Sequence, residues 1–148
     1  MLKDLKTAAK VTGFTLHIAT SDKNIKDQLA AIVRQEDLPL AMSSWDLPVN
    51  VEFDDNGRIK NPTIKVTLLL VDKADSLLKK DLEEKAEEVG NLFIQYMRNL
   101  NNHLYTTTNV KEKPITGISF TYAPKFGSGQ HSGILANFTV QMNLEPDC

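Results

Sequence analysis

The feature that most constrains the fold is an amphipathic pattern that runs from Ser76 to about Tyr105. Apolar side chains recur there at every third or fourth position, as on one face of an α-helix. They are Leu78, Leu82, Ala86, Val89, Phe93, Met97, Leu100 and Leu104. The positions between them are mostly charged or polar, so only one face can be buried. The pattern predicts a long helix over about residues 76–105 that packs by its apolar face on a sheet.

The length of this helix limits the sheet that it can cover. About thirty helical residues at 1.5 Å each span roughly 45 Å. Strands of five to eight residues span only about 17–27 Å at 3.3 Å per residue. We therefore expect the helix to overhang the sheet, to kink or to be two helices. Gly90 is the most favourable position for a bend, because a glycine costs about 1 kcal/mol in a helix interior.

Alternation of apolar and polar residues, the period of a β-strand, marks several segments along the chain. They are Phe14–Ala19, Val49–Phe53, Thr63–Val71, Ile115–Tyr122 and Ile134–Leu144. The third of these becomes wholly apolar from Leu68 to Val71, which is typical of a central strand that is covered on both faces. The last has the most regular alternation in the chain, with an apolar residue at every even position.

The remaining segments complete a single-domain α+β layout over residues 1–148. Residues 1–12 are expected to form an N-terminal arm or short helix, and residues 22–36 a shorter helix with one apolar face. Leu38–Leu47 is expected to be irregular or weakly extended, and residues 145–148 a flexible C-terminus. Asn56-Gly57 is suited to a tight hairpin turn. The prediction is a mostly antiparallel sheet of about four to six strands with both helices packed on it.

Composition excludes several classes of function. The formal net charge is −2, from 17 basic and 19 acidic residues, which gives no electrostatic reason to expect nucleic-acid binding. Uninterrupted apolar runs such as Leu68–Val71 are far too short to cross a membrane. The N-terminus is too charged for a signal peptide. A single cysteine, Cys148, permits no intrachain disulfide, which fits a reducing compartment. We expect a soluble, intracellular protein.

No group of residues predicts catalysis or metal binding. His17, His103 and His131 fall on different predicted elements without metal-ligand spacing. Asp54-Asp55-Asn56-Gly57 lacks the alternating ligands and distal glutamate of a calcium loop, and turn formation explains it. No serine lies in a nucleophile-elbow sequence, and Cys148 has no positioned base. We therefore predict no catalytic residues, no cofactor and no metal, and a protein that is not an enzyme.

The segment Ala123–Gly133 is predicted to be a long hairpin loop with three glycines. It superficially resembles a phosphate-binding loop, but it has no lysine after the glycines and does not open a helix. It is either a mobile hairpin tip or a protein contact made through Phe126 and its neighbours. Trp45, between two prolines, is either a core residue or an interface anchor. The predicted interface residues are Trp45, Lys125, Phe126, Gln130 and His131.

The order of the elements resembles that of the tail-terminator and head–tail connector (tail completion, neck ring) proteins of tailed bacteriophages. The resemblance spans about residues 30–144. It is carried by Leu38-Pro39-Leu40 before a proline-bounded strand, by Thr63–Val71 before a long helix, by the strand Ile115-Thr-Gly-Ile-Ser-Phe, and by Gly133-Ile-Leu-Ala-Asn-Phe-Thr-Val-Gln-Met. The simplest layout of that family begins with a helix, whereas here the strand Phe14–Ala19 precedes the helix at 22–36.

The resemblance implies a structural virion protein that forms an oligomeric ring at the head–tail neck or tail. Its partners would be copies of itself and other neck or tail proteins, with no small-molecule substrate, no sequence-specific nucleic acid and no membrane. Such a protein is located in the virion and is made in the cytoplasm of the bacterial host. The alternative is a cytosolic α+β binding or adaptor module, either a monomer or a dimer, without catalytic activity. A small enzyme is a third class.

Overall fold

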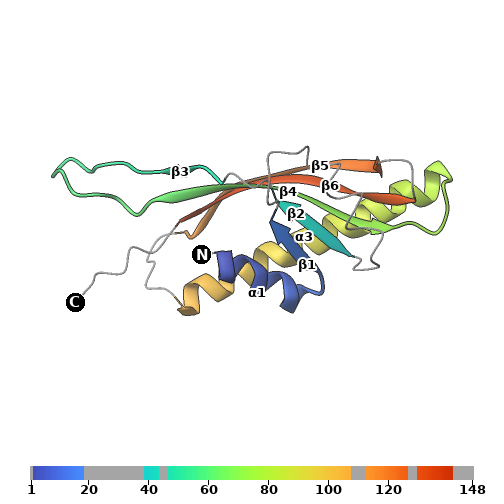
Figure 1. The fold of residues 1–148 in the computed structure, drawn as a ribbon, viewed down its shortest axis with the longest axis horizontal. Coiled ribbons are helices and arrows are strands. Elements are labelled where there is room, and N and C mark those ends of the chain that lie inside the picture. Colours follow the sequence, from blue (N-terminus) through green and yellow to red (C-terminus); the bar gives the residue numbers. More distant parts are fainter. Residues whose placement is uncertain (1, 19–38, 44–46, 108–112, 127–129, 142–148) are drawn as a thin grey trace.

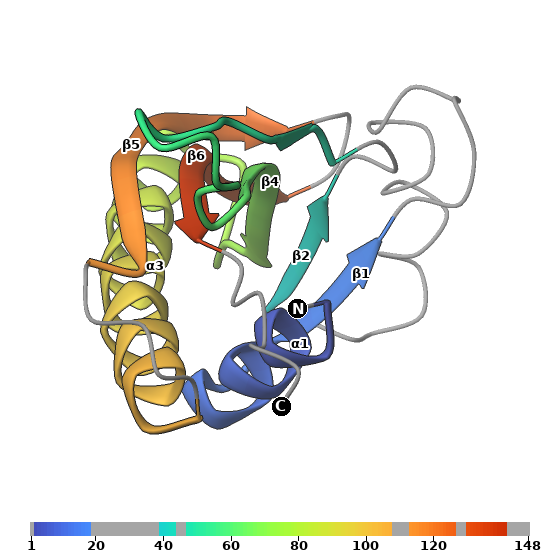
Figure 2. The same cartoon turned by 90° about the vertical axis from the view of Figure 1, so that its left-hand side faces the viewer.

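The described residues form a two-layer α+β structure in which their two helices lie on the same face of one sheet (Figures 1 and 2). The computed structural model describes residues 2–18, 39–43, 47–107, 113–126 and 130–141. The helices are α1 (Leu2–Thr12) and α3 (Lys79–Thr107). The strands are β1 (Thr15–Ile18), β2 (Leu40–Ser43), β3 (Val49–Asn50), β4 (Thr63–Lys73), β5 (Ile115–Phe126) and β6 (His131–Gln141). The predicted class and the predicted helix at the N-terminus are confirmed. The helix predicted at 22–36 lies outside the described residues.

The sheet has six strands in the order β1-β2-β4-β6-β5, with β3 paired to β4 beside this path. Only β1 and β2 run parallel among the described pairs, so the prediction of a mostly antiparallel sheet is confirmed. The expectation that Leu38–Leu47 is irregular is wrong for part of the segment, because Leu40–Ser43 forms a strand inside the sheet. All four of its residues are buried, and a short strand covered on both faces shows no alternation in the sequence.

The predicted central strand is confirmed by the position and burial of β4. This strand pairs with β2 on one side and along its whole length with β6 on the other. Its alternate residues Ile64, Val66, Leu68 and Leu70 face the helices and belong to the main core. Leu69 and Val71 point to the opposite face and are buried too. The wholly apolar second half of the strand therefore reflects cover on both faces.

Helix α3 is a single, unbroken helix, and β4 and β5 extend past the segments that alternate in the sequence. β5 has 12 residues and β6 has 11, so they span about 36–40 Å and nearly match the helix. The expectation of two helices is therefore wrong, whereas an overhang and a kink at Gly90 stay predictions. Gly90 has another role: a Cβ there would lie 3.1 Å from a ring carbon of Tyr122 and 3.2 Å from one of Phe120. The glycine lets the aromatic rings of β5 approach the helix.

Aromatic rings fill the core between α3 and the sheet. Phe93 and Tyr96 of α3 pack against Phe138 of β6, with ring centroids 6.1 and 6.2 Å away. Phe14 meets the Tyr96 ring edge-on at 5.0 Å. The Tyr96 hydroxyl donates a hydrogen bond of 3.0 Å to the carbonyl of Leu5, which joins α1 to α3. Burial raises the pKa of Tyr96, so the hydroxyl stays a donor.

The two hairpins differ from their predicted extents in opposite directions. The Ala123–Gly133 segment is not a long loop, because β5 continues to Phe126, β6 begins at His131, and these two residues pair. The Val49–Phe53 segment is less regular than predicted, since β3 covers only two residues and Phe53 forms an isolated bridge with Ile59. The surplus of chain thus lies in the hairpin before β4 and not in the one between β5 and β6.

Candidate functional site: a projecting arm and an apolar groove

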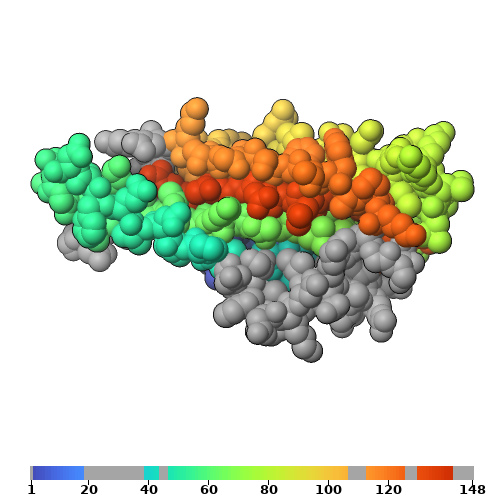
Figure 3. Space-filling view, turned by 90° about the horizontal axis from the view of Figure 1, so that it is seen from above, coloured from blue at the N-terminus to red at the C-terminus, as the bar shows by residue number. Residues whose placement is uncertain are grey.

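The hairpin of residues 47–62, here called the arm, projects beyond the ends of both helices (Figure 1). It is the teal and green end of the space-filling view (Figure 3). Its base is fixed to the sheet where Val49 pairs with Ile64 and Asn50 with Thr63. Further out, the amide of Lys60 donates a 2.8 Å hydrogen bond to the carbonyl of Glu52. The arm is therefore an extension of β4 and its partner strand that no described helix covers.

The tip of the arm is a turn held by Asp54. One carboxylate oxygen of Asp54 accepts hydrogen bonds of 2.9 Å from the amides of Asn56 and Arg58. The Asp54 amide donates to the Arg58 carbonyl at 2.7 Å, and Gly57 has a φ of +76°. These contacts confirm the predicted tight turn. The carboxylate of Asp54 is thus engaged in holding the turn, whereas Asp55 beside it is exposed.

Large apolar side chains on the arm face solvent. Val49, Val51, Phe53 and Ile59 are 50%, 55%, 67% and 52% exposed. The first three alternate along an extended segment, and Ile59 lies opposite Phe53, so the four share one side. Val49 lies opposite Ile64, a core residue, so this side continues the helix-covered face of the sheet. The four side chains therefore form an exposed apolar strip along one side of the arm.

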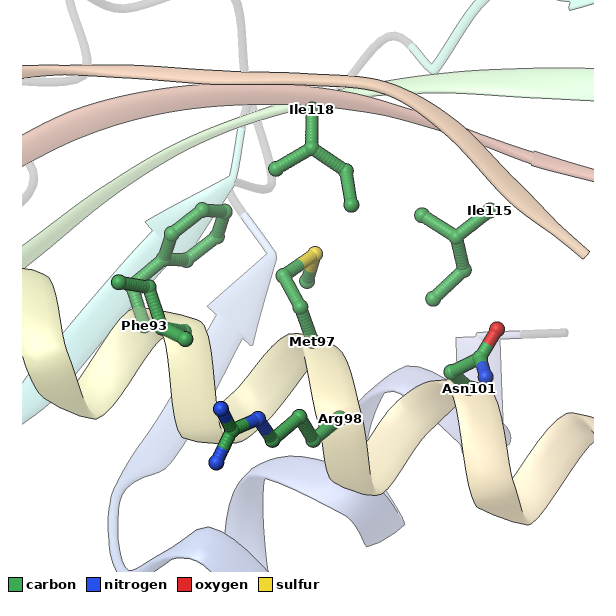
Figure 4. A pocket seen from close by; sticks show the side chains of 7 residues that line it. Phe93, Met97, Arg98, Asn101, Ile115 and Ile118 are labelled. Atoms are coloured by element: carbon green, nitrogen blue, oxygen red, sulfur yellow. The ribbon is translucent and has the colours of Figure 1, made fainter.

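A groove opens between α3 and the edge strand β5 (Figure 4). Its volume is about 290 Å³, and its lining is Phe93, Ile94, Met97, Arg98, Asn101, Ile115 and Ile118. Ile115 and Ile118 point from β5 towards Met97 on the helix (Figure 4). Ile94 and Ile118 remain 43% and 49% exposed at its sides. The groove is therefore an apolar surface that the single chain leaves incompletely filled.

A β-bulge in β5 shapes the groove. The register between β5 and β6 shifts between Thr116 and Ser119, so two residues oppose one at this point. Gly117 has a φ of +64°, the left-handed conformation that a glycine adopts without strain. The bulge places Ile118 over the groove, and it interrupts the regular hydrogen-bonding edge of β5.

The groove supplies apolar contact and one cation. Arg98 and Asn101 are its polar lining residues, on the side of α3. Neither carries a carboxylate, hydroxyl, thiol or imidazole group that could act as a base or a nucleophile. Among the described residues no three histidine, cysteine or acidic side chains lie close enough to hold a metal ion. The chemistry of the groove fits an apolar side chain of a protein with a negative charge beside it.

The predicted interface residues of the β5–β6 hairpin lie at the opposite end of the sheet from the arm (Figure 1). We call this the closed end: residues 72–82, 123–126 and 130–133. Lys125 is exposed there, and the backbone of Phe126 pairs with His131. The Gln130 carbonyl accepts from the amide of Ala74 at 2.7 Å. Trp45 lies outside the described residues. A role of these residues in an interface stays a prediction.

Further contacts fasten the closed end to α3. The hydroxyl of Ser132 is buried and donates to the carbonyl of Leu82 in the first turn of the helix. Lys85 of α3 lies 3.9 Å from the Asp72 carboxylate. A hydrogen bond to Glu88 at 2.8 Å raises the pKa of Lys85, and partial burial opposes this. The closed end is therefore joined to the helix by both backbone and side-chain contacts.

The surroundings of His131 at the closed end shift its pKa. Partial burial, together with the positive charge of Lys73, lowers the pKa of His131, while Asp72 acts in the opposite direction. The other histidines lie on separate elements, His17 on β1 and His103 on α3, where the latter contacts Asp4 at 2.8 Å. The three histidines are not brought together, in agreement with their scattered positions in the sequence.

A comparison with protein-family models finds no match for this chain, and a comparison with curated proteins finds none either. Within the described parts of the chain, neither helix combines the length and the apolar character needed to cross a bilayer.

Proposed function

We propose that this chain is a structural subunit that assembles with copies of itself, as a ring at the head–tail neck or tail of a tailed bacteriophage. The observation that carries the proposal is the arm, whose apolar side faces solvent at the end of the sheet. The layout of strands and long helix, similar to that of tail terminators and connectors, supports the virion setting. In that setting its partners are further copies and the neighbouring neck or tail proteins, and it is made in the bacterial host cytoplasm.

The energetics of the arm favour a contact with another molecule. Burying a Val, Ile or Phe side chain fully is worth about 1.5–3 kcal/mol. The four arm side chains are half or more exposed, so burial of the exposed part of each one in an interface would contribute about 1 kcal/mol. The free strand edges of a projecting hairpin can also pair with other chains. Proteins normally avoid such edges and exposed apolar strips unless they are used for binding.

The position of the arm at one end of the molecule favours a ring over a symmetric dimer. In a symmetric dimer the same patch meets itself, whereas an arm that contacts a different surface of the next copy repeats the contact around a ring. The described surface offers such a second patch in the groove.

Size-exclusion chromatography with light scattering, followed by negative-stain microscopy, tests the proposal. The wild type is expected to form a ring or a concentration-dependent oligomer, and Val51→Ser/Phe53→Ser to be monomeric at the same concentrations. Val11→Ser is the control, because Val11 is 71% exposed on α1, away from the arm. A wild type that stays monomeric at every concentration overturns the proposal. A strict dimer that the arm variant does not affect favours the adaptor class.

A further inference from the structure

We infer that the groove between α3 and β5 binds the tip of the arm of a second copy of this chain. The inference rests on the proposed function, since it names the two surfaces that meet when copies assemble. Phe53, with Ile59 beside it, is the side chain pair that enters, and Arg98 at the side of the groove faces the acidic tip. Four observations on the described residues lead to this pairing.

The first observation is the size and chemistry of the groove. An apolar cavity of about 150 Å³ holds one benzene ring. The groove, at about 290 Å³, therefore has room for the ring of Phe53 and for an aliphatic side chain next to it. Phe53 is the most exposed of the apolar arm residues, and Ile59 is paired with it across the hairpin. The arm thus presents one aromatic and one aliphatic side chain side by side.

The second observation is the charge on each side. The tip carries Asp54, Asp55 and Arg58, so its net charge is −1, and of its two carboxylates only that of Asp54 accepts hydrogen bonds in the turn. Arg98 is the charged residue of the groove and is exposed. In the part of the chain that the structure describes, no ion pair is formed by Asp55 or by Arg98. An arm tip seated in the groove brings these opposite charges together.

The third observation is that the arm does not occupy the groove of its own chain. No arm residue lines the groove, and the arm is fixed at its base to β4 and extends past the end of the sheet (Figures 1 and 3). The arm that fills a groove therefore belongs to another copy. Because arm and groove are different surfaces, each copy keeps one unused surface after pairing, and the contact propagates until a ring closes.

The fourth observation is the bulge at Gly117. A regular edge strand attracts a further strand by backbone hydrogen bonds, and a bulge is a common way to prevent this. The bulge lies beside the groove and turns Ile118 over it. The first part of β5 is thus shaped for contact between side chains and not for addition of a strand.

Leu77 and Leu78 at the closed end are the main competing receptor, since they are 56% and 68% exposed. They are carried by a segment that precedes α3, and they do not line the groove between α3 and β5. They also lack an arginine beside them, because the neighbouring cations are Lys79 and Lys80. Leu78 therefore serves as the matched control position.

Mixing two variants tests the pairing. Phe53→Asp removes a working arm, and Ile94→Glu removes a working groove while placing a glutamate four residues before Arg98, a spacing that supports the helix. Each variant alone is expected to assemble about tenfold more weakly or not at all. An equimolar mixture is expected to form a heterodimer, because one intact arm and one intact groove remain. Leu78→Glu is expected to assemble like the wild type.

Disulfide trapping gives a second test that does not depend on disruption. In a Cys148→Ser background, Phe53→Cys in one copy and Ile118→Cys in another are expected to cross-link under mild oxidation. Phe53→Cys with Leu78→Cys is the control pair and is expected to stay uncrosslinked. Circular dichroism and melting of each variant establish that it is folded.

The outcomes separate this inference from the proposed function. A wild type that assembles, together with an Ile94→Glu variant that assembles equally well and no cross-link to Ile118, overturns the groove as the receptor but leaves self-assembly intact. Loss of assembly in Leu78→Glu, with cross-linking at that position, also overturns it and assigns the closed end instead. A wild type that is monomeric throughout overturns self-assembly itself.

Discussion

The two ends of the sheet are built from the same strand, β4, but they are held very differently. At the closed end, Ser132 and Gln130 connect the β5–β6 hairpin to α3 and to the chain after β4. At the other end, the described contacts of the arm are its own hairpin hydrogen bonds, the Lys60–Glu52 ion pair, its pairing with β4 and the packing of Leu47 against the core. The surplus length of this chain thus lies in the arm, which no described helix covers. Folding stability should therefore depend on the core and the closed end, and assembly on the arm.

The largest expected difference is between two phenylalanines. Phe93→Ala should lower the free energy of unfolding by about 3–5 kcal/mol, because Phe93 is fully buried among aromatic rings. Phe53→Ala should change it by no more than about 0.5 kcal/mol, since its ring is 67% exposed. Urea denaturation at low protein concentration, where assembly adds no stability, measures both. Equal losses would mean that the arm is part of the folding core.

A pair of glycines gives the next largest contrast. At Gly133 of the closed end, a Cβ would lie 1.9 Å from the carbonyl oxygen of Leu70, so Gly133→Ala should cost about 3 kcal/mol through displacement of β4 or β6. At Gly57 of the arm, a Cβ would meet nothing within 4 Å, and only its positive φ opposes the change. Gly57→Ala should cost about 1 kcal/mol. Thermal melting of both variants checks the order, and a reversed order would contradict it.

Loss of the Ser132 hydroxyl should have a moderate effect. Ser132→Ala leaves the carbonyl of Leu82 without this donor in a buried setting, for an expected loss of about 1–2 kcal/mol. Ser119 is exposed on β5, so Ser119→Ala is the control and should be neutral. Hydrogen exchange of the first turn of α3 would show the loss locally. Unchanged protection there would mean that the closed end is not fastened by this contact.

The smallest effect expected is a pH dependence from His131. Its pKa is lowered in the folded protein, so the unfolded chain takes up a proton first as the pH falls through about 6.5. The contribution of neutral His131 to the free energy of unfolding is therefore present above that pH and is lost progressively below it. The melting temperature should decrease more between pH 7.5 and pH 5.5 in the wild type than in His131→Gln. An equal or larger fall in the variant would contradict this sign.

Much of the fold was predictable because its elements leave periodic patterns in the sequence. The apolar face of α3 and the alternation of β6 are visible without any tertiary information. The strand β2 was not predictable in this way, because a four-residue strand buried on both faces has no period. The length of β5 is underestimated, and β6 begins three residues earlier than predicted, because Ala123 to Gly133 contains proline and glycines that are typical of loops, yet much of it pairs as strand.

The arm and the groove show why the site was harder to predict than the fold. Val49, Val51 and Phe53 alternate as a strand with a buried face does, and the sequence does not tell whether a helix covers that face. Cover depends on where α3 ends relative to β4 in space. One signal was available for the groove, since Gly117 within an otherwise alternating strand is typical of a bulge. No sequence signal pairs that bulge with Ile94 on the helix.

The continuity of β4 from the arm into the centre of the sheet has a mechanical consequence. β4 is aligned with β6 over residues 63–73 in an unbroken antiparallel register. A force that pulls on the arm along its length acts parallel to both strands, so all these hydrogen-bonded pairs resist it together and do not open one after another. A subunit held by its arm is thus loaded in shear at the middle of its sheet, the arrangement in which many weak bonds carry tension jointly.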